Sequence, residues 1–239
     1  MAIIISISGM TGTGKSTCAR YISSNLHRAG LPNVYVRYRL VSLRSFFERP
    51  RTFRRFVMKR AEDFNPPVLA TPRFANYRFR RASHFWAFLP LLVWRVVLFR
   101  ILVQVRFAKT VVLVDRCFYD SLIHYPLRHP GYARLAQWVM RLLPAPDLAL
   151  MVHSPFETVR KRRPEYDERF LREHLANYLR LAELRPDIVL VTGDDIEAKM
   201  KRVNGIVTRY LADHIPAPTG ASSEGAAGLS GAESGDPNN

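Results

Sequence analysis

Cysteine is scarce in this sequence, which contains only Cys18 and Cys117. Two isolated cysteines cannot build the disulfide framework of a small secreted domain, so that class of protein is excluded. Met1 is followed almost at once by a strand-like run, and we therefore expect no signal peptide. The prediction is a reducing, cytoplasmic location, with a peripheral position on a membrane left open.

Acidic residues are also few, with 20 Asp and Glu against 36 Lys and Arg and a net charge of +16. The excess is uneven, because the segment 44–81 holds eleven basic and three acidic residues. Such a segment favours an anionic partner, for which a phosphorylated substrate, a nucleic acid and an acidic membrane surface are alternatives. For any single arginine, a solvated surface position without a specific partner is the simpler interpretation.

The C-terminal segment 216–239 lacks aromatic residues, and Leu229 is its only large aliphatic residue. It cannot bury enough apolar surface to fold, so we predict a disordered tail over 216–239. The remaining residues, 1–215, are sufficient for one sizeable α/β core, and we predict that they form a single domain.

Charge-free apolar runs long enough to cross a membrane are absent as well. The most apolar stretch, 84–107, contains Arg95, Arg100 and Arg106, and Pro90 interrupts it, so we exclude a spanning helix. Two alternatives stay open: a long core helix that also lines a homodimer contact, and an amphipathic segment resting on anionic lipid. Arginines on a buried helix need partners, and a substrate phosphate is one candidate for Arg95 and Arg100.

The segment Ile3–Thr17 reads IIISISGMTGTGKST, an apolar run followed by the pattern G-x-x-x-x-G-K-[ST]. In this pattern glycines let successive N–H groups surround a polyphosphate, Lys15 reaches the outer phosphates and Ser16 holds Mg²⁺. The strand before it and a predicted helix over 16–29 are the context that the motif requires, whereas a plain glycine-rich turn needs neither. We predict that the loop binds ATP or GTP. Its predicted nucleotide-binding residues are Gly9, Thr11, Gly12, Thr13, Gly14, Lys15, Ser16 and Thr17.

Four further short apolar runs, 33–40, 109–114, 147–153 and 187–192, are typical of buried strands separated by helices. The predicted fold is therefore an α/β, P-loop NTPase three-layer fold with a parallel five-stranded sheet and helices on both faces. Ligands of such sheets gather beyond the carboxyl ends of the strands, so Arg37 and Arg39 are predicted to lie near the phosphate site. The segment 45–83 has no strand period, and we expect short helices and loops there.

The strand 109–114 leads directly into Asp115 and Arg116. An aspartate in this position supports Mg²⁺ in phosphate-loop enzymes, and the neighbouring arginine can neutralise a transferring phosphoryl group. A structural salt bridge is the alternative. We predict that Ser16 and Asp115 are metal ligands and that Arg116 acts at the phosphoryl group.

These motifs, in this order, resemble the thymidylate kinase family of nucleoside monophosphate kinases. The likeness rests on GMTGTGKST, LVDRC and LPAPDLALMVHSPFETVRKRRPE, followed by YLRLAE and IVLVTGD. It implies a helical acceptor-side insertion at about 44–107, a basic lid at about 160–168, and ATP with Mg²⁺ as the phosphoryl donor. It also implies that Arg160 stacks on the adenine and that Arg162 and Arg163 close over the phosphoryl group. The catalytic candidates are then Lys15, Arg116, Arg162 and Arg163, and the acceptor-binding candidates are Arg37, Arg39, Arg95, Arg116 and Tyr119.

Four departures from the family concern the acceptor pocket. The family usually carries Asp or Glu at the position of Thr11, an aromatic residue at Cys117 and a serine at Asp120, and RYRLVSLRS replaces its Arg-Glu-Pro-Gly signature. The scaffold therefore matches better than the pocket does.

The expected function is transfer of the γ-phosphate of ATP to a phosphorylated small molecule, most simply a nucleoside monophosphate. One alternative is a kinase for a membrane-associated, lipid-linked or glycan-related acceptor. Another is a non-catalytic, nucleotide-gated nucleic-acid-binding protein. Such a protein has no need of a cationic lid, so nucleic acid is the least favoured partner.

Overall fold

The computed structural model describes residues 1–37 and 82–215. Arg39, the basic segment 44–81 and the predicted tail 216–239 lie outside the described residues. The predictions made for them are therefore left as predictions.

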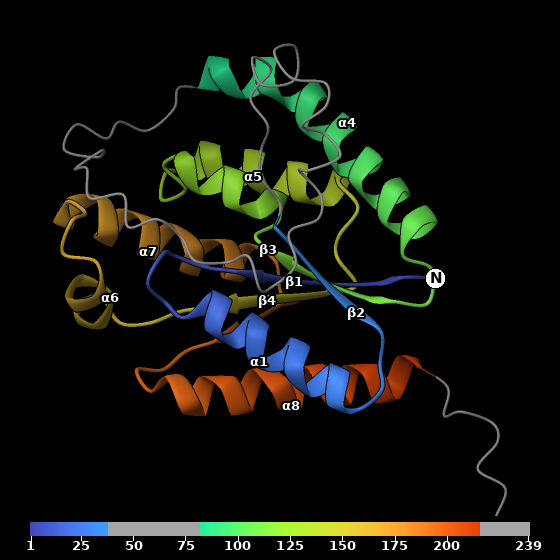
Figure 1. Cartoon of the computed structure of the whole chain (residues 1–239). Coiled ribbons are helices and arrows are strands. Elements are labelled where there is room, and N and C mark those ends of the chain that lie inside the picture. The colour runs from blue at the N-terminus through green and yellow to red at the C-terminus, as the bar shows by residue number, and fades with distance from the viewer. Residues whose placement is uncertain (38–81, 216–239) are drawn as a thin grey trace, which may run out of the picture.

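Five parallel strands form the sheet: β1 (Ile3–Ser8), β2 (Asn33–Arg37), β3 (Val111–Asp115), β4 (Leu148–Val152) and β5 (Ile188–Val191). Their order across the sheet is β2-β3-β1-β4-β5 (Figure 1). Every residue of β3 and β4 is buried, which explains why these strands show continuous apolar runs rather than alternation. The predicted fold class is confirmed.

Helices cover both faces of the sheet. On one face, α1 (Lys15–Arg28) and α8 (Ile196–His214) pack against each other (Figure 1). Their apolar residues, including Ile22 and Val207, form one core with Ile7 and Leu113 of the central strands. On the other face lie α4 (Ala82–Arg106), α5 (Pro130–Leu142) and α7 (Glu168–Leu184) (Figure 1). Two shorter elements, the 3₁₀ helix η2 (Phe118–His124) and α6 (Phe156–Arg162), follow β3 and β4 respectively.

The apolar stretch 84–107, for which a membrane-spanning helix was excluded from the sequence, lies almost entirely within the single helix α4. This helix continues through Pro90. Pro90 is exposed, so its ring displaces no core side chain and the loss of one main-chain hydrogen bond does not end the helix. Of the helices in the described ranges, none combines the length and hydropathy of a membrane-spanning segment.

Arg100 of α4 has a protein partner rather than a substrate phosphate. Its guanidinium donates to the carbonyl of Ala145 and, at 3.0 Å, to the carboxylate of Asp147. Asp147 also accepts from the main-chain N–H of Ile4 at 2.7 Å. The arginine thus fastens α4 to the start of β4, and the suggestion that Arg100 awaits a substrate phosphate is corrected.

The buried imidazole of His174 on α7 makes stability depend on pH. This side chain is 1% exposed, and its ring lies 4.0 Å from that of Phe170 and 5.7 Å from that of His124. Burial lowers the pKa of His174 to about 4, against opposing contributions from the hydrogen bond with the carbonyl of Phe170 and from the charge of Glu173, while the charge of Arg116 lowers it further. The folded protein therefore holds His174 neutral where an unfolded chain, with a pKa of about 6.5, takes up a proton.

We predict that the free energy of unfolding keeps the full contribution of neutral His174 above about pH 6.5. As the pH falls to about 4, this contribution is lost progressively, and the free energy of unfolding decreases by about 3 kcal/mol. Urea unfolding between pH 7 and pH 4 should show a shallower loss of stability for His174→Leu than for the parent. The exposed His27 provides the control, because His27→Asn should follow the parent curve. Parallel curves for His174→Leu and the parent would contradict the assignment.

Candidate active site

The phosphate-loop sequence forms a tight loop between β1 and α1, and two of its glycines are required by close packing. Gly9 has φ 141°, and a Cβ there would lie 2.2 Å from the carbonyl oxygen of Val152 at the end of β4. Gly14 has φ 95°, and a Cβ there would lie 2.4 Å from the Cδ1 of Ile196 in α8. A side chain at Gly9 would meet main chain and force the loop away from the sheet, whereas one at Gly14 would be strained by the positive φ and would displace the side chain of Ile196.

The amino end of α1 faces this loop and has no side-chain cap. Gly14 is the N-cap and supplies no side-chain acceptor, so the first N–H groups of the helix are not capped by a side chain. Lys15, 7% exposed, donates from Nζ to the carbonyl of Met10 at 2.8 Å, and Thr13 donates from Oγ1 to the same carbonyl at 2.8 Å. This arrangement of helix N–H groups and an ammonium is of the kind that can hold an anion.

Strand register brings Asp115 and Arg116 to the same loop. Asp115 pairs with Ile7 of β1 and with Arg37 of β2, and is 2% exposed. Arg116 follows with φ 69° and donates from its main-chain N–H to the carbonyl of Ile7 at 3.1 Å. Its guanidinium donates to Oγ1 of Thr11 at 3.2 Å. Two candidates 105 positions apart in the sequence are therefore in contact.

The donors available for a metal at this edge are hard oxygen atoms. Ser16 lies in the first turn of α1 and Asp115 at the end of the neighbouring β3. Across the described residues, no group of three or more His, Cys, Asp and Glu side chains is arranged to hold a metal ion. One hydroxyl and one carboxylate suit Mg²⁺, which takes oxygen ligands and completes its shell with water and phosphate oxygens.

Asp120 of η2 accepts more hydrogen bonds than any other carboxylate described at the site. From the sequence it was noted only as a departure from the family. It is 6% exposed and accepts from Ser8 Oγ at 2.7 Å and from the main-chain N–H of Cys117 at 3.1 Å. The hydroxyl of Tyr178 and, at 3.5 Å, the guanidinium of Arg116 also donate to it. Burial, followed by the charge of Asp120, raises the pKa of Tyr178 well above its ordinary range, so the phenol keeps its proton and donates.

Tyr119, a predicted acceptor ligand, lies in the core. It is 1% exposed, burial raises the pKa of its phenol, and its ring packs on Phe118 and lies 5.8 Å from the guanidinium carbon of Arg185. The structure does not bring Tyr119 to the surface of the site. Two further predicted acceptor ligands lie elsewhere. Arg37 ends β2 and pairs in register with Asp115. Arg95 is half-buried on α4.

The basic segment after β4 packs against the phosphate loop. Arg162 of α6 donates to the carbonyl of Gly12 at 3.2 Å, and a Cβ on Gly12 would lie 3.0 Å from Cγ of Arg163. Arg163 pairs with Glu165 at 3.2 Å. Arg160 donates to the carbonyls of Pro164 at 3.2 Å and Tyr166 at 2.6 Å. Arg160, which was predicted to stack on adenine, thus holds the turn that follows α6, while Arg162 and Arg163 lie at the loop.

Lys199 of α8 is a further cation at the loop, and the sequence analysis did not single it out. It is 1% exposed and donates to the carbonyl of Thr13 at 3.0 Å and to Oγ of Ser154 at 2.6 Å. Burial lowers the pKa of Lys199, and the charge of Arg162 lowers it further. Lys199 lies in the sequence four positions before Val203 and eight before Val207, both buried. A lysine within an apolar helical stripe is the sequence signal that could have identified it.

No protein-family model and no curated protein matches this chain. Among solved structures, the chain is similar to a thymidylate kinase from Ehrlichia chaffeensis, with a TM-score of 0.49 and 14% sequence identity. The alignment covers 87% of this chain and 98% of that one. At this identity, no residue role passes from that enzyme to this chain.

Two buried tyrosines, Tyr178 beside Asp120 and Tyr119 in the core, provide a matched test of the Asp120 contacts. Tyr178→Phe removes a donor to a buried carboxylate, and we expect a loss of about 2 kcal/mol in the free energy of unfolding. The hydroxyl of Tyr119 is equally buried and has no hydrogen-bond partner among the described residues, so Tyr119→Phe should change stability by less than about 0.5 kcal/mol. Urea unfolding at neutral pH measures both values. Equal losses would show that Asp120 gains nothing from Tyr178.

Proposed function

We propose that this protein is an ATP-dependent phosphotransferase that acts on a phosphorylated small molecule, most simply a nucleoside monophosphate. The observation that carries the proposal is the convergence of cations from separate segments on the loop after β1. Lys15 lies within the loop, Arg116 donates to Thr11, and Arg162 donates to the carbonyl of Gly12. Fixed positive charge around a polyphosphate loop suits phosphoryl transfer, in which negative charge spreads over several oxygens.

In the proposed reaction, an oxygen of the acceptor attacks the γ-phosphorus of ATP, and the bond from that phosphorus to the ADP oxygen breaks. Lys15 exchanges the carbonyl of Met10 for the outer phosphates, since a phosphate oxygen is the stronger acceptor. Arg116, held by Asp120 and beside Thr11, neutralises the phosphoryl group and the acceptor phosphate. Mg²⁺, held by Ser16 and Asp115, supplies further charge neutralisation when bound.

The arginines of α6 fit the role of a closing element in this proposal. Arg162 and Arg163 lie on the loop side of a short helix whose following turn is held by Arg160. Closure of such an element excludes water and adds positive charge at the transferring group. The predicted stacking of Arg160 on adenine stays part of the proposal and requires that its guanidinium leave the carbonyls of Pro164 and Tyr166.

A coupled assay of ADP release tests the proposal directly. The acceptors are a panel of nucleoside monophosphates, with sugar phosphates and lipid phosphates alongside, each in the presence of ATP and Mg²⁺. We expect turnover with at least one phosphorylated acceptor and a loss of roughly a hundredfold to a thousandfold in Lys15→Ala. The exposed Lys201 of α8 gives the matched control, because Lys201→Ala should retain full turnover. Equal turnover in Lys15→Ala and the parent would contradict the proposal.

Thr11 determines how well thymidylate is expected to serve as the acceptor. The family resemblance places a carboxylate at this position to hold the sugar hydroxyl, and a hydrogen bond to a charged group is worth about 1.5 to 3 kcal/mol. We predict poor thymidylate turnover by the parent and an increase of roughly tenfold to a hundredfold in kcat/KM for Thr11→Asp. Thr11→Asn, which has a similar shape without the charge, should give a smaller gain. Efficient thymidylate turnover by the parent would show that the hydroxyl of Thr11 suffices.

A further inference from the structure

All three tryptophans of the chain are exposed on two neighbouring helices. Trp86 and Trp94 of α4 are 57% and 63% exposed, and Trp138 of α5 is 45% exposed. The rings of Trp86 and Trp138 lie 6.1 Å apart and so join the two helices. Tryptophan is on average highly buried in folded proteins. Three exposed indoles on adjacent elements therefore indicate a surface with a partner.

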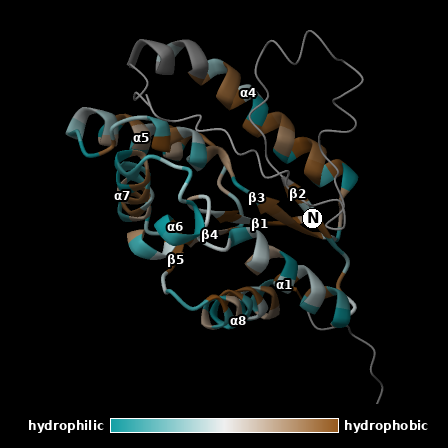
Figure 2. Ribbon diagram, turned by 60° about the vertical axis from the view of Figure 1, so that its left-hand side comes forward, coloured by the Kyte–Doolittle hydropathy of each residue, from teal (hydrophilic) through white to brown (hydrophobic). Residues whose placement is uncertain are grey.

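The apolar surface continues along α4 beyond the indoles. Val97, Ile101 and Val105 are 38%, 54% and 78% exposed, and with Trp94 they follow a spacing of three and four residues along one side of the helix. The opposite side contributes Leu92, Val96 and Val103 to the core. Figure 2 shows α4 as a largely hydrophobic helix on the outside of the sheet layers. We call the following residues the tryptophan surface: Trp86, Trp94, Val97, Ile101 and Val105 of α4, with Trp138 and Leu142 of α5.

The charge on the two helices that carry this surface is positive throughout. The sequence contains no Asp or Glu between Asp63 and Asp115, and none between Asp120 and Asp147. Exposed arginines lie on the same helices, Arg106 on α4 and Arg134 and Arg141 on α5. Within residues 1–37 and 82–215, no carboxylate forms an ion pair with these three arginines. The apolar surface therefore carries positive charge that the described carboxylates do not neutralise.

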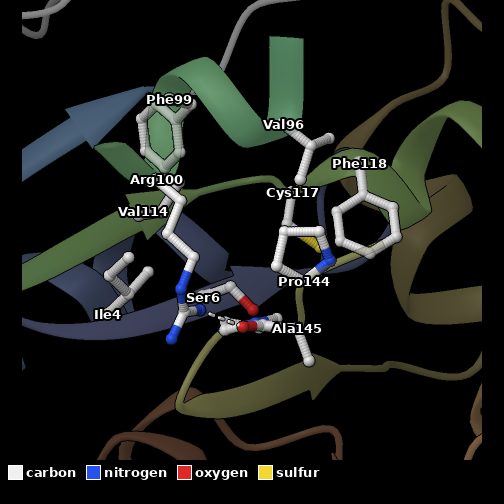
Figure 3. A pocket seen from close by; sticks show the side chains of 11 residues that line it. Ile4, Ser6, Val96, Phe99, Arg100, Val114, Cys117, Phe118, Pro144 and Ala145 are labelled. Carbon is white, nitrogen blue, oxygen red and sulfur yellow. Dashed lines mark hydrogen bonds between the residues drawn. The ribbon is translucent and has the colours of Figure 1, made fainter. Parts of the chain in front are cut away.

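The small cavity beneath α4 is a different feature and does not account for the surface. It has a volume of about 30 Å³ and lies between α4, β1, β3 and the segment 144–146 (Figure 3). Arg100 crosses it toward the carbonyl of Ala145, and apolar side chains such as Phe99 and Phe118 line it (Figure 3). This space holds about one or two water molecules. Among residues 1–37 and 82–215, no side chain covers the exposed indoles of this surface.

We propose that the tryptophan surface docks on an anionic lipid bilayer. Indole rings favour the boundary between headgroups and acyl chains, where one part of the ring is apolar and the N–H stays in a polar layer. The flanking arginines attract anionic headgroups. A second copy of the chain is the competing occupant, but it would bring its own arginines and a net charge of +16 to the same contact, and like charges oppose that association. This docking is independent of the reaction proposed above.

Vesicle binding tests the proposal, and the fluorescence of the three surface tryptophans reports the binding. The full chain is mixed with vesicles of phosphatidylcholine alone or of phosphatidylcholine with phosphatidylglycerol, and binding is measured by flotation and by tryptophan fluorescence. We expect binding to the anionic vesicles, a blue shift of the emission, and quenching by lipids brominated near the headgroup. Because all three tryptophans lie on the proposed surface, the shift reports contact of that surface in particular.

Variants on and off the surface separate docking from general charge attraction. Trp94→Ser with Ile101→Ser should weaken vesicle binding at least about tenfold. Arg134→Gln with Arg141→Gln should weaken it roughly tenfold, whereas the exposed pair Arg202→Gln with Arg209→Gln on α8 removes the same charge and should change binding little. Circular dichroism melts confirm folding. Val105→Ser, at the most exposed position of the stripe, is the milder substitute if the double variant unfolds.

Three outcomes would overturn the proposal. The first is failure of the parent to bind anionic vesicles, or binding without a fluorescence shift. The second is equal weakening by the α5 and α8 arginine pairs, which would show attraction by overall charge alone. The third is a dimer in sedimentation equilibrium that Trp94→Ser with Ile101→Ser dissociates, which would identify a second copy as the occupant. Loss of kinase activity in the panel assay would leave the docking result unaffected, so the two proposals fail separately.

Discussion

The buried carboxylate of Asp120 holds the candidate site together, because its acceptor oxygens join groups from three parts of the chain. It accepts from Ser8 at the end of β1, from Arg116 at the end of β3 and from Tyr178 on α7. A buried carboxylate is costly unless hydrogen-bond donors surround it. These elements are therefore held in one arrangement, with the guanidinium of Arg116 directed to Thr11 and the phosphate loop.

The sequence was sufficient to predict the fold and the position of the Asp-Arg pair at the phosphate loop, since both follow from simple patterns. Continuous apolar runs separated by helices indicate a parallel sheet, and carboxyl ends of adjacent parallel strands meet at one edge. The register of Ile7 with Asp115 is an instance of this rule. The apolar stripe around Lys199 marks it in the sequence as a buried position, but its contact with Thr13 spans 186 positions and depends on how α8 packs, so the sequence did not show what Lys199 binds. Helix α5 was not assigned, although Pro130 at its start and the helical spacing of its buried residues Ala133, Ala136, Val139 and Met140 are sequence signals for it.

The arginines also show why residue type alone does not predict role. Arg100, Arg116 and Arg160 all looked like candidates for phosphate or nucleotide, yet their contacts differ in kind. Arg100 is bonded to Asp147 and Ala145 as a structural link, and Arg116 is shared between a buried carboxylate and a hydroxyl of the loop. Arginine suits all of these roles because its planar fork can satisfy several acceptors at once. A structural arginine differs from one that can act on substrate only in the hydrogen-bond acceptor that its guanidinium meets, and the fold determines that acceptor.

Basic side chains of the described residues gather in two different arrangements. At the loop, Lys15 and Arg162 donate to neutral main-chain carbonyls of Met10 and Gly12, and a polyphosphate competes well for such donors because its oxygens are charged. Lys199 is buried, so it is positioned to support the loop from α8 rather than to exchange partners. On α4 and α5 the cations flank apolar surface instead of a concave site. Charge beside exposed indoles suits a flat anionic partner, whereas charge within a glycine loop suits a small one, and one chain carries both arrangements.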